Sequence, residues 1–343
     1  MNTGCIETKE LERVFFGLAI EAQKEIPPML QRSRKKVIIL AGPTGCGKSE
    51  FAMDFCEKVH GEIISGDSIQ VYRGMDIGTA KPTKQEQALI PHHLIDIRDV
   101  KDHFNVVDFY YEARHACQTV LSHESLPVIV GGSGFYLHSL LYGPPSGPPS
   151  VPELRKSLED EMKEKGADVL FERLKQLDEE YARTITKHDK QKIIRGLEII
   201  TLSNKKVSKL SWKNRNKPLN YDFRCWFFHR PKEVLYPRIE RRCDKMLERG
   251  FLEEVEALLP AIESNSSACQ AIGYRQAIEF LKSKRSKEDY NRFVDAFKQA
   301  SRNYAKRQMT WFRREPMFRW IDLDAHDPEV VMDIIEQDFE QSI

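Results

Sequence analysis

The sequence predicts an α/β protein in which a parallel β-sheet is flanked by helices, together with a small all-helical insertion. Two observations carry this prediction. Short apolar runs followed by glycine alternate with segments of helical spacing along the first part of the chain. A proline-rich stretch then interrupts this alternation, and helical patterns follow it.

Three apolar runs are expected to be strands of the sheet. Val37–Ala41 ends in a Gly-rich turn, which is typical of a buried parallel strand. Lys48 to about His60 has its large apolar residues at helical spacing. Glu62–Ser65 and Pro127–Val130 are the next two apolar runs, and each precedes glycine. This succession of strand, helix and strand predicts a parallel sheet with helices on both faces.

A domain boundary is expected at Tyr142–Pro152, because five prolines and two glycines in these eleven residues cannot continue a helix or a strand. Ser150 and Glu153 have capping-box spacing for a helix that begins near Pro152. The expected division is an N-terminal extension, a core in two segments and a helical insertion: 1–34, 35–146 with 211–343, and 147–210. From Tyr221 the aromatic composition predicts a return to the sheet, and helical stretches then run toward Trp320.

Composition excludes some classes of protein. The chain has 343 residues, of which 41% are hydrophobic, so it is long enough for about two domains with buried cores. The formal net charge is +1, so a basic surface must be local. Seven cysteines without a C-x-x-C pair argue against disulfides or structural zinc, and favour a reducing cytoplasm. No apolar run approaches the roughly 20 residues that span a bilayer. Residues 1–34 contain five glutamates, which disfavours an import signal and favours a surface helix or extension.

One motif binds phosphate. Gly42-Pro43-Thr44-Gly45-Cys46-Gly47-Lys48-Ser49 matches G-x-x-x-x-G-K-[ST] in full, between an expected strand and an expected helix. Its backbone amides converge on phosphate oxygens, Lys48 adds a cation and Ser49 offers a hydroxyl to Mg²⁺. The expected fold is therefore of the P-loop NTPase-like type.

The acidic residue of this site is expected at Asp67. A motor or GTPase usually has a Mg²⁺-holding acid after a later strand, whereas here Pro127–Val130 is followed by Gly131-Gly132-Ser133. Asp67 follows the second strand, and ligands of parallel sheets bind at the carboxyl ends of strands. A carboxylate there could deprotonate a nucleophile, or could act as a helix cap or a partner of Mg²⁺. The pattern favours group transfer over a motor.

The segment after Asp67 carries the most specific motif. It reads Asp-Ser-Ile-Gln-Val-Tyr-Arg-Gly-Met-Asp-Ile-Gly-Thr-Ala-Lys-Pro over residues 67–82. With the P-loop, it closely resembles the tRNA dimethylallyltransferases, also called tRNA isopentenyltransferases. Five further stretches match in family order, between about Lys36 and Trp320: 91–96, 130–136, 238–242, 273–276 and 305–311.

The resemblance implies transfer of a dimethylallyl group from dimethylallyl diphosphate to N6 of adenosine 37, next to the tRNA anticodon. The P-loop with Mg²⁺ would then hold the diphosphate leaving group. By the same resemblance Asp67 is the base acting on the amine and Arg242 reaches the diphosphate, with Arg238 one helical turn away. Many members have threonine where this chain has Ser133. The hydroxyl is kept, so a catalytic hydrogen bond near Asp67 survives, but a methyl contact is lost.

RNA contacts are implied in three short stretches, because a stacked adenine must be extruded into a pocket. By resemblance they are Asp67, Ser68, Ile69 and Gln70; Gln191, Lys192, Ile193, Ile194 and Arg195; and Gln270, Ala271, Ile272, Gly273, Tyr274 and Arg275. Two segments are expected to face RNA from their composition alone. Asn204–Lys217 has six basic residues, no acidic ones and Trp212, and Ser301–Arg319 interleaves basic residues with aromatic ones. In the second segment Trp311 and Phe312 could equally be core residues.

Three alternative functions remain at this stage. A P-loop small-molecule kinase explains residues 42–49 and Asp67 but not the 67–82 motif. A transferase acting on free adenine nucleotides would share the core motifs, although it needs neither the insertion nor the basic segments. A non-catalytic RNA-binding protein is disfavoured by the intact Lys48, Ser49 and Asp67.

Eukaryotic members of the family often add a C-terminal zinc finger, and this sequence shows no such cysteines and histidines before Ile343. The expectation is a bacterial-type, monomeric cytoplasmic enzyme that uses Mg²⁺, tRNA and dimethylallyl diphosphate and has no membrane partner.

Overall fold

The computed structural model describes residues 35–210 and 221–340. The expected extension over 1–34 lies outside the described residues, as does the part of the basic segment that contains Trp212. Contacts divide the chain into two units, a core unit of Met1–Leu141 with Pro218–Ile343 and a helical unit of Tyr142–Lys217. Each unit is described by itself. The predicted boundaries, after residue 146 and after residue 210, lie inside the helical unit.

The core unit contains a six-stranded sheet in the order β3-β2-β4-β1-β5-β6, and every neighbouring pair is parallel. The strands are β1 Lys35–Ala41, β2 Gly61–Ser65, β3 His92–His93, β4 Leu126–Gly131, β5 Tyr221–His229 and β6 Phe318–Asp322. Side chains from Val37 to Ala41 are fully buried, as expected for a central strand covered on both faces. The predicted class, a parallel sheet flanked by helices with a P-loop, is confirmed.

The strand register brings three loops to one edge of the sheet. Ser65 lies opposite Val130 across the β2–β4 pair, and Gly131 lies opposite Ala41 across the β4–β1 pair. Because these strands are parallel, their carboxyl ends lie level. The loops that follow β1, β2 and β4 therefore emerge side by side.

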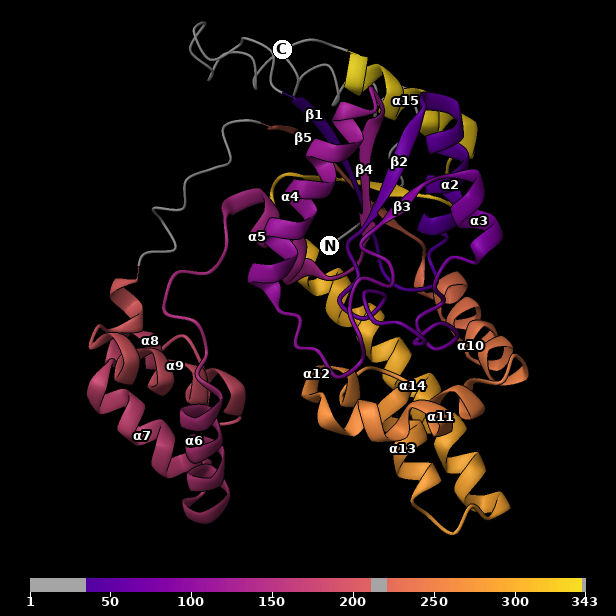
Figure 1. Cartoon of the computed structure of the whole chain (residues 1–343). Coiled ribbons are helices and arrows are strands. Elements are labelled where there is room, and N and C mark those ends of the chain that lie inside the picture. The colour runs from indigo at the N-terminus through magenta and orange to yellow at the C-terminus, as the bar shows by residue number, and fades with distance from the viewer. Residues whose placement is uncertain (1–34, 211–220, 341–343) are drawn as a thin grey trace, which may run out of the picture. The chain divides into compact units, whose positions relative to one another are not determined.

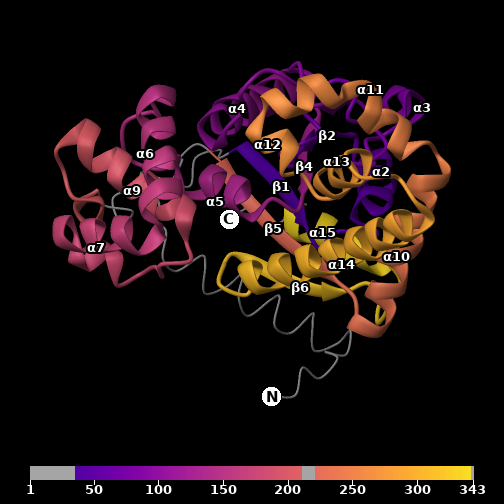
Figure 2. The same cartoon turned by 90° about the horizontal axis from the view of Figure 1, so that it is seen from below.

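Ten helices are described in the core unit. They are α2 Lys48–Val59, α3 Lys84–Leu89, α4 Val106–Ser122, α5 Gly134–Tyr142, α10 Lys232–Glu248, α11 Phe251–Ser264, α12 Ser266–Cys269, α13 Tyr274–Leu281, α14 Lys287–Phe312 and α15 Pro328–Glu340. Helices α2 and α4 cover opposite faces of the sheet (Figure 2). Helices α10 to α14 form a layer beyond the carboxyl ends of the strands, in which α14 packs against α10 and α13 (Figure 1). No described helix is both long and apolar enough to cross a membrane.

The end of the core unit corrects one prediction. The helical pattern expected to continue toward Trp320 ends at Phe312, and Phe318–Asp322 forms the edge strand β6 beside β5. Pro316 lies between the two elements, and a proline together with the residue before it disfavours a continuing helix. The side chains of Phe318 and Ile321 are buried, and their burial favours a strand conformation for this segment.

The helical unit is built from α6 Pro152–Lys165, α7 Ala167–Leu177, α8 Glu179–Ala182, α9 Lys190–Ser203 and a 3₁₀ turn at Val207–Lys209. Leucines and isoleucines of α6, α7 and α9 form its buried core. The capping box expected from Ser150 and Glu153 is wrong. The Ser150 hydroxyl donates instead to the buried Glu198 carboxylate, at 2.5 Å between Oγ and Oε1, and α6 has no side-chain cap. Burying a carboxylate costs free energy unless its oxygens accept hydrogen bonds, and the Ser150 hydroxyl supplies one of these bonds to Glu198.

Candidate active site

The P-loop, Gly42–Ser49, turns from the end of β1 into the first turn of α2. Gly47 precedes the helix with φ of 101°, a backbone conformation in which any other residue is strained. Lys48 is half-buried and Ser49 is exposed. The loop has the strand–turn–helix setting that the motif predicts, and the binding of a phosphate group by its amides and the amino end of α2 stays a prediction.

Three arginines converge on this loop. The contacts are Arg230 Nε to Cys46 O at 2.6 Å, Arg238 Nε to Gly45 O at 3.0 Å, and Arg242 Nη1 to Thr44 Oγ1 at 2.9 Å. Arg238 and Arg242 lie one turn apart on α10, as expected. Arg230 was missed by the sequence analysis, although its place directly after β5, at a strand's carboxyl end, is a signal that could have found it. Together the guanidinium groups give the loop a strongly cationic surround.

Asp67 shares this environment. Burial lowers the pKa of Lys48 and of Arg242, and the negative charge of Asp67 acts on both in the opposite direction, so the carboxylate lies near both cations. Two cations that are close together and partly shielded from water are stabilised by the binding of another negatively charged group. The residues predicted to hold a diphosphate and to act as base are thus brought together.

The Asp67 carboxylate is held in a fixed orientation. Its Oδ1 accepts from the backbone amides of Ile69 at 2.8 Å and Gln70 at 3.4 Å. Within the described residues, Oδ2 accepts no hydrogen bond. This is an Asx-type turn and not the helix cap considered as an alternative, because the next helix begins only at Lys84; it leaves one oxygen free for a substrate proton.

Ser133 and Tyr304 lie beside Asp67. Burial raises the pKa of Tyr304 to about 12, the charge of Asp67 adds to this, and the nearby Ser133 hydroxyl opposes it. The buried Ser133 hydroxyl makes no well-formed hydrogen bond in the described part of the chain, so it retains capacity for a substrate group. Tyr304 was noticed in the sequence only as one aromatic residue of a basic segment.

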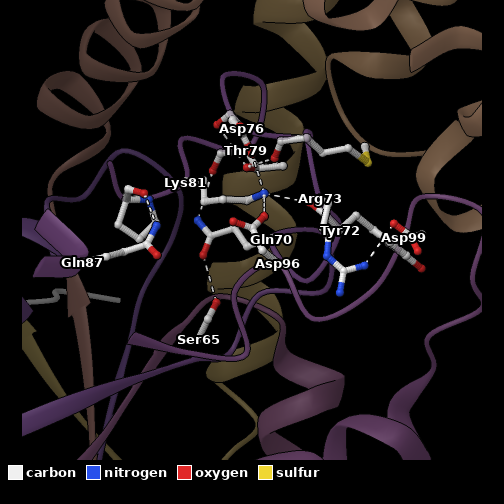
Figure 3. A network of polar contacts seen from close by, with 12 residues as sticks. Ser65, Gln70, Tyr72, Arg73, Asp76, Thr79, Lys81, Gln87, Asp96 and Asp99 are labelled. Carbon is white, nitrogen blue, oxygen red and sulfur yellow. Dashed lines mark hydrogen bonds and ion pairs between the residues drawn. The ribbon is translucent and has the colours of Figure 1, made fainter. Parts of the chain in front are cut away.

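The 67–82 segment is folded around one buried cation. Lys81 Nζ donates to Tyr72 O at 2.7 Å, to Asp76 Oδ1 at 2.6 Å and to Asp96 Oδ1 at 2.5 Å (Figure 3). Gln70 donates to the carbonyl of Thr79 at 3.3 Å and accepts from Ser65 at 2.9 Å. Both the oxygen and the nitrogen of the Gln70 carboxamide form hydrogen bonds in the free protein. Gln70 therefore holds the 67–82 segment in place, whether or not it also contacts RNA.

A carboxylate of α11 clamps the same segment from the other side. Glu254 Oε2 accepts from the amides of Asp76 at 2.9 Å and Ile77 at 2.6 Å, while Oε1 accepts from the Gly78 amide at 3.1 Å and the Tyr274 hydroxyl at 2.6 Å. Burial and the charge of Glu254 raise the pKa of Tyr274. Glu254 could not be predicted from the sequence, because a glutamate on an amphipathic helix carries no local signal of its partners.

The expected RNA-contact residues differ in exposure. Ile193, Ile194, Ala271 and Tyr274 have buried side chains, whereas the side chains of Gln191, Lys192, Gln270 and Arg275 are exposed. Asp67, Ser68, Ile69, Gln70, Arg195 and Ile272 are half-buried, and Gly273 is buried. Arg195 is already committed to Glu198, with 2.7 Å between Nη1 and Oε2, and Gln191 accepts from Arg155. Residues 191–195 lie on α9 of the helical unit. In the core unit, residues 270–273 connect α12 to α13, and Tyr274 and Arg275 begin α13.

The basic segment Ser301–Arg319 separates into exposed and engaged residues. Trp311 is 40% exposed whereas Phe312 is 1% exposed, so the two aromatics divide between surface and core. Arg302 is paired with Glu240 and Arg319 with the buried Asp338. The exposed cations are Lys306, Arg307, Arg313 and Arg314.

No group of three or more His, Cys, Asp or Glu side chains suited to hold a metal is found among the described residues. A Mg²⁺ site of the kind expected at Ser49 does not need one, because this ion keeps several waters and binds substrate phosphates, and the Ser or Thr hydroxyl of a P-loop is one of its protein ligands. The exposed Ser49 hydroxyl at the phosphate loop fits such a donor set.

The fold and the site define a P-loop α/β enzyme whose phosphate loop faces a carboxylate, an arrangement for group transfer from a phosphorylated donor. The IPP transferase family matches residues 70–315, which is well over half of the chain. The chain belongs to this family, that of the tRNA dimethylallyltransferases, and it is of the bacterial type, with highly similar relatives in Protochlamydia and Chlamydia.

Individual relatives cover almost the whole chain. The tRNA dimethylallyltransferase of Protochlamydia amoebophila is 63% identical over 340 residues, covering 99% of this chain and 98% of the relative. That of Chlamydia caviae is 46% identical, covering 98% of this chain and 95% of the relative. The crystal structure of tRNA isopentenylpyrophosphate transferase from Bacillus halodurans is 34% identical, with a TM-score of 0.64 over 89% of this chain and 97% of that chain. A eukaryotic dimethylallyltransferase acting on tRNA gives a TM-score of 0.70 at 29% identity, covering 86% of this chain and 75% of that chain.

Proposed function

We propose that this chain transfers the dimethylallyl group of dimethylallyl diphosphate to N6 of adenosine 37, next to the anticodon of tRNA, and releases diphosphate. The observation that carries the proposal is the meeting of a complete P-loop with Asp67 at one sheet edge, in a chain of this family. A kinase would share the loop, but its relatives would not be tRNA dimethylallyltransferases.

On the donor side of the reaction, the enzyme must stabilise the diphosphate leaving group. The bond from the allylic carbon to the diphosphate oxygen breaks, and negative charge grows on the diphosphate. Lys48, the loop amides and Arg242 would stabilise that charge, and Arg238 and Arg230 lie close enough to the loop to contribute. Mg²⁺ bound through Ser49 would neutralise part of the diphosphate charge.

The acceptor side is a weak nucleophile. The lone pair of an adenine amine is delocalised into the ring, so N6 attacks best as its proton leaves. Asp67 would take that proton on Oδ2, while its Oδ1 stays fixed by the Ile69 amide. The Ser133 hydroxyl would hydrogen-bond the amine or the ring and keep N6 aligned.

The RNA would be held by exposed cations and aromatics of the core unit and by residues of the helical unit. Lys306 and Arg307 lie near Tyr304 on α14, and the exposed Trp311 offers a face for stacking a base. The helical unit, with the exposed Gln191 and Lys192, would contact the RNA as well. We further propose a monomeric enzyme in the cytoplasm, where tRNA is modified.

Two comparisons of substrates test the proposal. The chain is incubated with tRNA and either labelled ATP or labelled dimethylallyl diphosphate, with and without Mg²⁺. Label is expected on the RNA only from dimethylallyl diphosphate, and more slowly without Mg²⁺. Phosphate transfer without prenyl transfer would reject the proposal. In a second comparison an anticodon stem-loop competes with AMP as acceptor, and preference for AMP would reject the tRNA assignment.

A further inference from the structure

One face of α14 lies against the loop that carries Ser133. Tyr304, Gln308 and Trp311 are spaced by four and three residues, so they share a face of the helix. Tyr304 lies beside Ser133, and the Gln308 carboxamide meets Gly132. A side chain on Gly134 would come within 2.3 Å of Trp311 Cδ1. Three residues of one helix thus lie against three consecutive residues, of which Gly132 and Ser133 belong to the loop and Gly134 begins α5.

Gln308 joins this loop to the phosphate loop. Its Oε1 accepts from the backbone amide of Thr44 at 2.9 Å, and its Nε2 donates to the carbonyl of Gly132 at 3.0 Å. The side chain is 5% exposed, so both hydrogen bonds are protected from water. Position 132 favours glycine, because an added Cβ would lie 2.0 Å from Gln308 Nε2 and 2.9 Å from the backbone carbonyl oxygen of Gly42.

We propose that Gln308 is a positioning residue that couples the donor and acceptor sides of the reaction. It acts through two backbone groups and touches neither substrate. Thr44 bears the hydroxyl to which Arg242 donates, and Gly132 directly precedes Ser133. A carboxamide has a fixed separation between its oxygen and nitrogen, so the tip of the phosphate loop and the Ser133 loop hold one distance.

The coupling matters because the two loops carry different reactants. The two loops follow the neighbouring strands β1 and β4. The strand pairing ends where the loops begin, so it does not prevent one loop from moving relative to the other. A shift of about 1 Å between reacting groups can cost about a hundredfold in rate. The inference rests on the proposed use of dimethylallyl diphosphate, since this molecule must reach from the phosphate loop to the amine held at Ser133.

Two variants and one control test it in the full-length chain. Gln308→Met keeps the size and removes both hydrogen bonds. Gln308→Glu keeps the acceptor for the Thr44 amide but turns an oxygen toward the Gly132 carbonyl. Gln299→Met is the control, because Gln299 is the same residue type on α14 but its carboxamide contacts Asn303 and Arg302 of that helix and neither loop. The measurements are the single-turnover rate per folded enzyme, the KM for dimethylallyl diphosphate and the Kd for an anticodon stem-loop.

The expected result is a single-turnover rate lowered by about 10- to 100-fold in both Gln308 variants. The Kd for the stem-loop is expected to stay within about twofold, and the control is expected to match the wild type. In Gln308→Glu, the added negative charge beside the phosphate loop also raises the KM for dimethylallyl diphosphate. Rates within twofold of wild type, or a Kd weakened as much as the rate, would overturn the proposal. A wild-type enzyme that transfers no prenyl group refutes the proposed function itself, and the coupling with it.

Discussion

The clamp between Glu254 and the 67–82 segment predicts a large effect from a very small chemical change. Glu254→Gln replaces one carboxylate oxygen by an NH₂ group and keeps the shape. Even if Tyr274 reverses its hydroxyl to accept from the new amide, one of the three backbone amides loses its acceptor. The remaining hydrogen bonds lose their charged partner.

The magnitude follows from the four contacts at 2.6–3.1 Å. Hydrogen bonds to a charged group contribute about 1.5–3 kcal/mol, against about 1 kcal/mol for neutral ones. Solvent screens charges at half-buried contacts, so the charged hydrogen bonds of Glu254 contribute less than these full values. The expected loss in free energy of unfolding is therefore about 2–3 kcal/mol. For a chain of 343 residues the melting temperature should fall by about 3–4 °C.

The assay is urea unfolding followed by circular dichroism, alongside the rate of prenyl transfer. Glu253→Gln is the matched control, since its exposed carboxylate on the same helix makes no hydrogen bond to the segment among the described residues, and a change within about 0.5 kcal/mol is expected. Activity should also fall in Glu254→Gln, because the clamped segment includes Thr79, whose carbonyl accepts from Arg242 at 3.5 Å. Equal stability of the two variants would refute the reasoning.

Three further predictions concern single positions. Asp67→Asn keeps the turn but removes the base, so the single-turnover rate should fall about 100- to 10,000-fold while RNA affinity, measured by filter binding, stays within twofold; wild-type turnover would remove Asp67 from the mechanism. Gly132→Ala puts a methyl group 2.0 Å from Gln308 Nε2, and urea unfolding should show a loss of about 1–3 kcal/mol; unchanged stability would contradict this close packing. Burial alone would raise the pKa of Glu62, but hydrogen bonds from two histidines outweigh it and hold the pKa below its ordinary 4.5. The folded-state pKa is thus the lower one, so the stability from this group is present above pH 4.5 and is lost as the pH falls through the folded-state pKa. Glu62→Gln should reduce the loss of stability at acid pH. An unchanged pH profile of unfolding would show that the Glu62 carboxylate and its two histidines contribute nothing to stability.

The parts of the fold that depend on local sequence were predictable. The strands β1, β2 and β4 are apolar runs that end at glycine, and the P-loop is defined by its own residues. The two-residue strand β3 is too short for any periodicity, and β6 was mistaken for helix because its aromatic residues follow a long helical pattern. Only the packing of Phe318 and Ile321 beside β5 decides its conformation.

The supporting residues of the site could not be predicted in the same way. The Thr44 amide and Gln308 are 264 residues apart in sequence, and Glu254 meets Ile77 across 177 residues. Their partners are backbone groups, which have no sequence signature at all. Arg230 is different, because its position at the end of a strand marks it once β5 is recognised.

The most direct test is mass spectrometry of the nucleosides and of the nuclease-digested oligonucleotides of tRNA after incubation with the chain and dimethylallyl diphosphate. The account predicts one dimethylallyl group on the adenosine next to the anticodon, present with the wild type and missing with Asp67→Asn. An unmodified adenosine with the wild type, or a prenyl group on a different nucleoside, would contradict it.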